Sequence, residues 1–166
     1  ELGRDGGLPQ RRDLLMLNRT REAGQRFLAA SAAYNFAQYV VFLDPERKKG
    51  LHRSCVRAYA NAAPHFAVPA RSFALPFRKR IVRGYLRVPE GHGPHPVVVI
   101  FNGTNGVKEE LHCWSDAYLE RGIATVTLDG PGLGQTFHRL SSVAEPRPLG
   151  VAIMNHIESM PELDSD

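Results

Sequence analysis

The sequence has few of the residues that build metal clusters and disulfide frameworks. Its 166 residues include only two cysteines, Cys55 and Cys113, which stand too far apart for a CxxC redox motif or a thiolate metal cluster. Both lie in apolar-periodic stretches, which predicts reduced thiols in the core of a cytoplasmic protein. His92 and His95 have no carboxylate or cysteine at ligand spacing. The sequence therefore predicts no metal site.

Long hydrophobic runs and charge of one sign are also scarce. The longest mostly apolar stretch, 36–43, is far short of the roughly 20 residues needed to span a bilayer. No signal-peptide apolar region stands at the start. The formal net charge is only +4, and the basic residues are scattered rather than gathered on one face. We therefore expect a cytoplasmic protein that binds neither a membrane nor nucleic acid.

Two nucleotide-binding motifs and the nucleophile elbow of serine hydrolases are missing. The segment 129–136 has Gln135 where a dinucleotide fingerprint needs its third glycine, and Lys108 stands where a Walker loop starting at Gly103 needs its second. No Gly-x-Ser-x-Gly sequence occurs in the chain. We therefore expect no cofactor, and no serine elbow within these residues.

Hydrophobic periodicity divides the chain into a helical segment, 1–70, and an α/β segment, 71–166. Asp44 followed by Pro45 has the residue types of a helix N-cap and first helical position. Pro76 confines its strand to a sheet edge. The expected elements are antiparallel helices over 18–43 and 45–64, an edge hairpin of strands over 73–77 and 82–88, a strand over 96–101, a helix over 108–121, a strand over 123–128 and a helix over 149–160.

The two later strands and the helix between them predict a right-handed βαβ unit with parallel strands. The run 96–101 is apolar on both faces, which predicts a central strand covered on both sides. Ligands bind beyond the carboxyl ends of such strands, so the loops 102–106 and 129–136 should carry the chemistry. The first loop either presents backbone N–H groups to an oxyanion or is a plain strand-to-helix turn.

Four segments together resemble the amino-terminal half of an α/β-hydrolase: 84–91 (GYLRVPEG), 94–99 (PHPVVV), 102–110 (NGTNGVKEE) and 129–136 (DGPGLGQT). They are most similar to the group that contains 2,6-dihydroxypseudooxynicotine hydrolase, the FrsA-like proteins and the fungal polyketide-shortening hydrolases. The resemblance implies an α/β fold: the N-terminal part of an α/β-hydrolase sheet, incomplete, preceded by a helical lid segment.

The resemblance also implies which residues take part in catalysis. Gly103, Thr104 and Asn105 would form the oxyanion loop, whereas the serine, aspartate and histidine of the triad would follow beyond Asp166. The chain alone would then be inactive. The candidate substrate-binding residues are Tyr34, Tyr39, His112 and Trp114. Each of them has an alternative role in the core, at a helix cap or on the surface.

The function implied is that of the front half of a serine-type hydrolase. It would act on an ester, amide or carbon–carbon bond beside a carbonyl in an aromatic or polyketide-like small molecule. Two alternatives stay open: a non-hydrolytic cyclase or binding protein of the same fold, and a structural fragment without a site. A second polypeptide would carry the rest of the hydrolase core, and a homo-oligomer also stays open.

The first testable prediction concerns independent folding. The strand ending at Leu128 should lack the neighbour that the elbow strand supplies, and an open apolar edge promotes association. A nick in an exposed acidic turn at 163–166, or loss of the second half, would account for the missing strand. Residues 1–166 expressed alone should therefore be insoluble or dimeric in size-exclusion chromatography and inactive on esters. A monomeric, cooperatively melting and active product would contradict this expectation.

Overall fold

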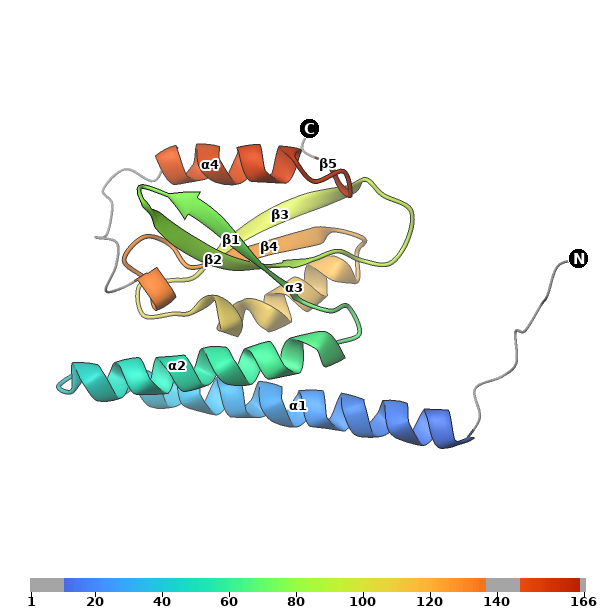
Figure 1. Cartoon of the computed structure of the whole chain (residues 1–166), viewed down its shortest axis with the longest axis horizontal. Helices are drawn as coiled ribbons and strands as arrows, with labels where there is room; N and C mark the ends of the chain where they lie inside the picture. The colour runs from blue at the N-terminus through green and yellow to red at the C-terminus, as the bar shows by residue number, and fades with distance from the viewer. Residues whose placement is uncertain (1–10, 137–146, 165–166) are drawn as a thin grey trace, which may run out of the picture.

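The fold is a mixed five-stranded sheet with helices on both faces (Figure 1). The computed structural model describes residues 11–136 and 147–164. The strands are β1 (Arg71–Phe77), β2 (Arg80–Arg87), β3 (His95–Phe101), β4 (Ala124–Leu128) and β5 (Leu163–Asp164). Their order in the sheet is β1-β2-β4-β3-β5. The antiparallel pairs are β1–β2 and β2–β4, whereas β3 is parallel to both β4 and β5. The helices are α1 (Arg11–Tyr39), α2 (Pro45–Ala62), α3 (His112–Leu119) and α4 (Arg147–Glu158), with 3-10 turns η1 (Ala63–His65), η2 (Lys108–Leu111) and η3 (Gly134–Thr136).

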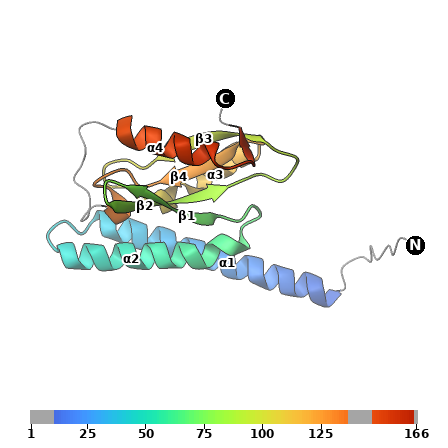
Figure 2. The same cartoon turned by 45° about the horizontal axis from the view of Figure 1, so that its top comes forward.

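Each face of the sheet has its own core. Helix α4 covers one face, and α3 lies on the other face with the α1–α2 pair beyond it (Figures 1 and 2). Side chains of a strand alternate between faces, so Val82 and Leu86 of β2 pack in the cluster that includes α4. Tyr85, between them, packs with Tyr59 of α2 in a second cluster. The helix pair is thereby attached to the sheet.

The helix pair forms as the sequence predicts, with shifted ends. Helix α1 begins at Arg11 and ends at Tyr39, so it starts earlier and stops earlier than expected. Asp44 is the N-cap of α2, because its side chain accepts a hydrogen bond from the Arg47 N–H at 2.9 Å. Within the described ranges, no helix is both long enough and apolar enough to cross a membrane.

The expected position of the open sheet edge is wrong. Strand β4 pairs with β2 on one side and β3 on the other, and all five of its residues are buried. The strand with an incomplete neighbour is β3, because β5 pairs only with His95 and Pro96. For the same reason residues 97–100 are only half-buried, although their apolar sequence predicts full coverage. The crossover from β3 thus inserts β4 between β2 and β3.

The exposed acidic turn expected at 163–166 is also wrong for its first two residues. Leu163 is buried and pairs with His95, and Asp164 pairs with Pro96. These two residues form β5 rather than a turn, while residues 165–166 lie outside the described part of the chain. A backbone held in a sheet is a poor site for a nick.

Helix α3 packs against the core with a face that includes neither Cys113 nor Trp114. Its buried residues are Ser115 and Leu119, which follow the buried Leu111 of η2 at spacings of four residues. Cys113 is therefore exposed, which contradicts the prediction of two core thiols, whereas Cys55 is buried. Trp114 also lies on the outer face, with 63% of its surface exposed.

Two glycines give a matched test of packing. An added Cβ at Gly84 would collide with the Phe73 ring and lie 2.7 Å from the Thr127 carbonyl oxygen, whereas one at Gly50 in α2 would meet nothing within 4 Å. Gly84→Ala should therefore lower the free energy of unfolding by about 1–3 kcal/mol through overpacking. Gly50→Ala should raise it by about 1 kcal/mol, because alanine favours a helix interior. Urea unfolding of the full-length protein that contains this chain measures both changes, and equal effects of the same sign would contradict the packing described.

Candidate active site

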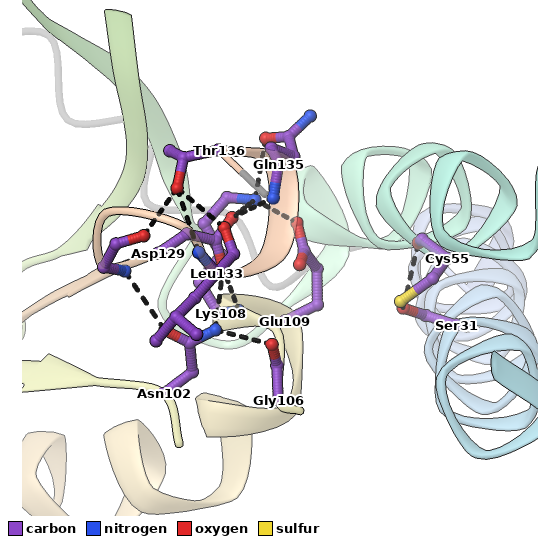
Figure 3. A network of polar contacts seen from close by, with 11 residues as sticks. Ser31, Cys55, Asn102, Gly106, Lys108, Glu109, Asp129, Leu133, Gln135 and Thr136 are labelled. Carbon is purple, nitrogen blue, oxygen red and sulfur yellow. Dashed lines mark hydrogen bonds and ion pairs between the residues drawn. The ribbon is translucent and has the colours of Figure 1, made fainter. Parts of the chain in front are cut away.

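Two loops meet at the carboxyl ends of β3 and β4. Asn102, the first residue after β3, joins them through its buried side-chain amide (Figure 3). Its Nδ2 donates to the Gly106 carbonyl at 2.6 Å and to Asp129 Oδ1 at 3.2 Å. Its Oδ1 accepts from the Gly130 N–H at 3.2 Å. This one side chain closes its own loop and attaches it to the next, as expected for neighbouring parallel strands.

Asp129 is the fixed centre of this junction. Its side chain is fully buried and accepts from the backbone N–H groups of Lys108 at 2.9 Å and Gln135 at 3.0 Å. Lys108 Nζ lies 3.2 Å from its Oδ2. Gly134, at φ +46°, closes over the carboxylate, and a Cβ there would collide with it. The turn sequence after β4 therefore folds tightly around one buried negative charge.

A buried lysine lies between two carboxylates. Lys108 Nζ donates to Glu109 Oε1 at 2.6 Å and to Gln135 Oε1 at 2.8 Å, in addition to Asp129. Burial alone would lower the pKa of Lys108, but the carboxylates of Glu109 and Asp129 hold it above its ordinary value. Burial also raises the pKa of Glu109, against the attraction of Lys108. The two carboxylates therefore share one buried cation.

The loop after β3 keeps several backbone donors free. Gly106 N–H donates to the Gly103 carbonyl at 2.9 Å and closes a turn. Among the described residues, the N–H groups of Gly103, Thr104 and Asn105 make no hydrogen bond, and all three residues are exposed. Consecutive free amides of this kind can stabilise a negatively charged oxygen.

A cavity of about 200 Å³ opens beside these amides. Gln38 Nε2 donates to the Asn105 carbonyl at 3.1 Å, so the end of α1 is attached to the loop. Thr104 and Asn105 lie in the cavity wall, but Gly103 does not. The wall comprises Gln38, Phe42, Pro45, Lys48, Lys49, His52, Thr104, Asn105, Gly106, Val107 and Gly134. The cavity thus lies between the α1–α2 turn and both loops at the sheet edge.

Tyr39 lies in a second cavity of about 390 Å³, between α1, α2 and the start of α3. Its hydroxyl donates to Glu110 Oε2 at 3.0 Å, and Asn35 Nδ2 donates to the same oxygen at 2.8 Å. Burial and then Glu110 raise the pKa of Tyr39 to about 12. Tyr34 is 40% exposed and lines neither cavity.

His112 lines the second cavity together with Tyr39, not the one beside the amides. Its Nδ1 lies 3.0 Å from the Tyr59 hydroxyl and its Nε2 lies 3.5 Å from Asp116. Burial and the nearby Arg87 lower the pKa of His112 to about 4, so the ring is neutral at pH 7. Trp114 lines neither cavity. The four expected substrate-binding side chains are therefore not gathered at the loop after β3.

The buried ion network and much of the cavity wall do not show in the sequence pattern. Lys108 and Glu109 begin a helical segment, where such residues are ordinarily solvated, and both types are rarely buried. Asp129 follows an apolar strand directly, and this position could have indicated that its carboxylate lies buried where the two loops meet. Lys48 and His52 gave no signal, because their position depends on how α2 packs against a distant loop.

This sheet order, with loops at the carboxyl ends facing a helical segment, defines the N-terminal part of an α/β-hydrolase fold. The chain belongs to the FrsA-like family: the family model described as "Esterase FrsA-like" matches residues 3–165.

Known relatives are longer than this chain. The 2,6-dihydropseudooxynicotine hydrolase of Paenarthrobacter nicotinovorans is 39% identical over 115 residues, which are 69% of this chain and 31% of that protein. Esterase FrsA of Salmonella paratyphi B is 31% identical over 115 residues, covering 68% of this chain and 28% of the esterase. The crystal structure of the 2,6-dihydroxy-pseudo-oxynicotine hydrolase superposes with a TM-score of 0.83 at 29% identity, over 90% of this chain and 42% of that one. AbyA5 shares the fold, with a TM-score of 0.67 at 19% identity over 88% of this chain and 44% of that one. The chain thus spans about a third of the curated relatives it matches.

The buried carboxylate gives the next prediction. Asp129→Asn removes the charge that faces Lys108 and should lower the free energy of unfolding by about 3–5 kcal/mol, since it leaves a buried ion without its partner. Glu120→Gln, which removes the same charge from an exposed position, should change the free energy by no more than about 0.5 kcal/mol. Urea unfolding measures both. A loss below about 1 kcal/mol for Asp129→Asn would show that the network does not hold the two loops.

Proposed function

We propose that this chain is the front half of a serine-type α/β-hydrolase and that it supplies half of the oxyanion hole. The observation that carries the proposal is the set of free N–H groups at Gly103, Thr104 and Asn105, beside a cavity. In acyl transfer the carbonyl oxygen becomes negatively charged, and fixed amide donors stabilise that charge without reorganising. The hydrogen bonds that Asn102 makes with Gly106 and Asp129 fix the loop and so keep these N–H donors in place.

The nucleophilic serine, with its aspartate and histidine, would come from sequence beyond this chain, in the same or a second polypeptide. Residues 97–101 of β3 support this arrangement, because their outer edge has no neighbour among the described strands. A strand added there would end beside the loop after β3. A serine following that strand would stand next to the free amides, as the reaction requires.

The α1–α2 pair would act as the substrate lid. Its turn lies over the cavity through Phe42, Pro45 and Lys48, and Gln38 attaches it to the loop. Phe42 and Val107 give the cavity an apolar part suited to an aromatic or polyketide-like molecule. The relative named 2,6-dihydropseudooxynicotine hydrolase supports hydrolysis of a small molecule, and the bond cleaved here would be an ester, amide or carbon–carbon bond beside a carbonyl.

Proline substitution tests the amide donors directly. Thr104 follows the first residue of the turn closed by Gly106 N–H and the Gly103 carbonyl, a position that accepts proline. In the full-length hydrolase that contains this chain, Thr104→Pro and Gly103→Pro each remove one N–H. At least one of them should lower kcat on an ester about 10²–10³-fold, the effect of losing one oxyanion donor.

The matched controls are Thr104→Ala and Gly103→Ala, which keep the N–H. Gly103 has open space around an added Cβ, so its alanine variant should fold normally. Circular dichroism and urea unfolding establish that each proline variant is folded. The proposal is wrong if neither proline variant lowers kcat further than its alanine counterpart. A wild-type protein that binds a small molecule without turnover would favour the non-hydrolytic alternative.

A further inference from the structure

We infer that the cavity beside the loop after β3 selects substrates that carry a carboxylate, with Lys48 and Lys49 as the residues that bind it. This inference rests on the proposed function and names the class of substrate for the same cavity. It depends on which charges line the cavity, which of them have partners, and where they lie relative to the free amides.

The charged wall of the cavity is entirely basic. Lys48, Lys49 and His52 come from the first two turns of α2, and no aspartate or glutamate is among the lining residues. Both lysines are half-buried, as is His52. Lys48 and His52, at positions i and i+4, lie on one side of the helix, and Lys49 lines the same cavity. Partial burial of Lys48 and Lys49 weakens screening by water and strengthens the combined attraction of their two ammonium groups for an anion.

Nearby carboxylates do not neutralise these lysines. Lys49 Nζ is 3.6 Å from Glu46, but that glutamate is 79% exposed, and exposed pairs of this kind contribute little. Lys48 Nζ lies 5.7 Å from the centre of the Phe42 ring and forms no ion pair with a described residue. Asp44 accepts the Arg47 N–H as helix cap. Glu110 is bound by Asn35 and Tyr39 in the second cavity.

The part of the wall formed by the loop after β3 supplies the reacting end. Thr104 and Asn105, with free N–H groups, come from the loop after β3, while the lysines come from α2. Phe42 and Val107 are the apolar members of the same wall. A substrate that reaches from the amides to α2 would therefore place a carbonyl at one end, an apolar middle, and an anionic group at the other. This order of groups matches an ester whose acyl chain ends in a carboxylate.

The test compares two esters that differ only in charge. The probes are the 4-nitrophenyl monoester of adipic acid, with a free carboxylate, and the same ester with a terminal carboxamide. The full-length hydrolase should show a kcat/KM about tenfold higher for the carboxylate ester at low salt, an effect expected from two partly exposed cations. The preference should shrink in 0.5 M NaCl, roughly the range in which screening becomes strong.

Two double variants separate cavity charge from net charge. Lys48→Met with Lys49→Met should lower kcat/KM for the carboxylate ester about tenfold more than for the carboxamide ester, so that the preference disappears. Misfolding would lower both values by the same factor and leave their ratio unchanged. Arg47→Met with Arg53→Met removes two charges from exposed positions of the same helix outside the cavity wall, and the preference should survive. Lys48→Arg with Lys49→Arg should retain it as well.

Equal kcat/KM values for the two esters in the wild type, or a preference lost equally in both methionine variants, would overturn the inference while leaving the hydrolase proposal standing. If neither ester is cleaved, titration calorimetry with adipate alone decides the inference, while the proline variants at 103 and 104 decide the oxyanion-hole proposal separately. Binding weakened about tenfold by the lysine variant alone would support the carboxylate site, and no adipate binding would overturn it.

Discussion

The arrangement of the loops depends on one buried carboxylate. Asp129 follows the buried strand β4 and accepts hydrogen bonds from the loop after β3, from the 3-10 turn after its own strand and from Lys108. The donors belong to three residues, Asn102, Lys108 and Gln135, which come from the two loops and the turn η2. A buried charge without partners would cost several kcal/mol. Moving either loop alone would remove hydrogen bonds from the buried Asp129 carboxylate, so the two loops hold each other in place. The free amides at 103–105 owe their fixed position to this constraint.

The helical segment and the sheet form the site jointly. The α1–α2 pair is attached to one face of the sheet through Tyr59 and Tyr85, and to the loop after β3 through Gln38. Its turn thereby forms one wall of a cavity whose other wall is the loop with free amides. Neither segment would enclose a ligand by itself.

Local sequence patterns predicted most elements, because each depends on residues close together in the chain. The N-cap at Asp44, the edge position of Pro76 and the buried run of β4 are examples. The pattern did not reveal that β4 enters the sheet between β2 and β3, since strand order depends on long-range packing. Nor could it show the burial of Lys108 and Glu109, because an adjacent Lys-Glu pair is ordinarily solvated. The rule that ligands bind at the carboxyl ends of parallel strands predicted the position of the two loops. It did not predict that residues of α2 line the cavity beside them.

The central claim is that backbone amides of the loop after β3, held by Asp129, bind the negatively charged oxygen of the reaction. The most direct measurement is the proton NMR shift of the Gly103, Thr104 and Asn105 amides in the full-length hydrolase, with and without a boronic acid that mimics the tetrahedral intermediate. The account predicts a large downfield shift of at least one of these amides on binding, because a new hydrogen bond to an anionic oxygen forms. Inhibitor bound at the site with all three amide signals unmoved would contradict it.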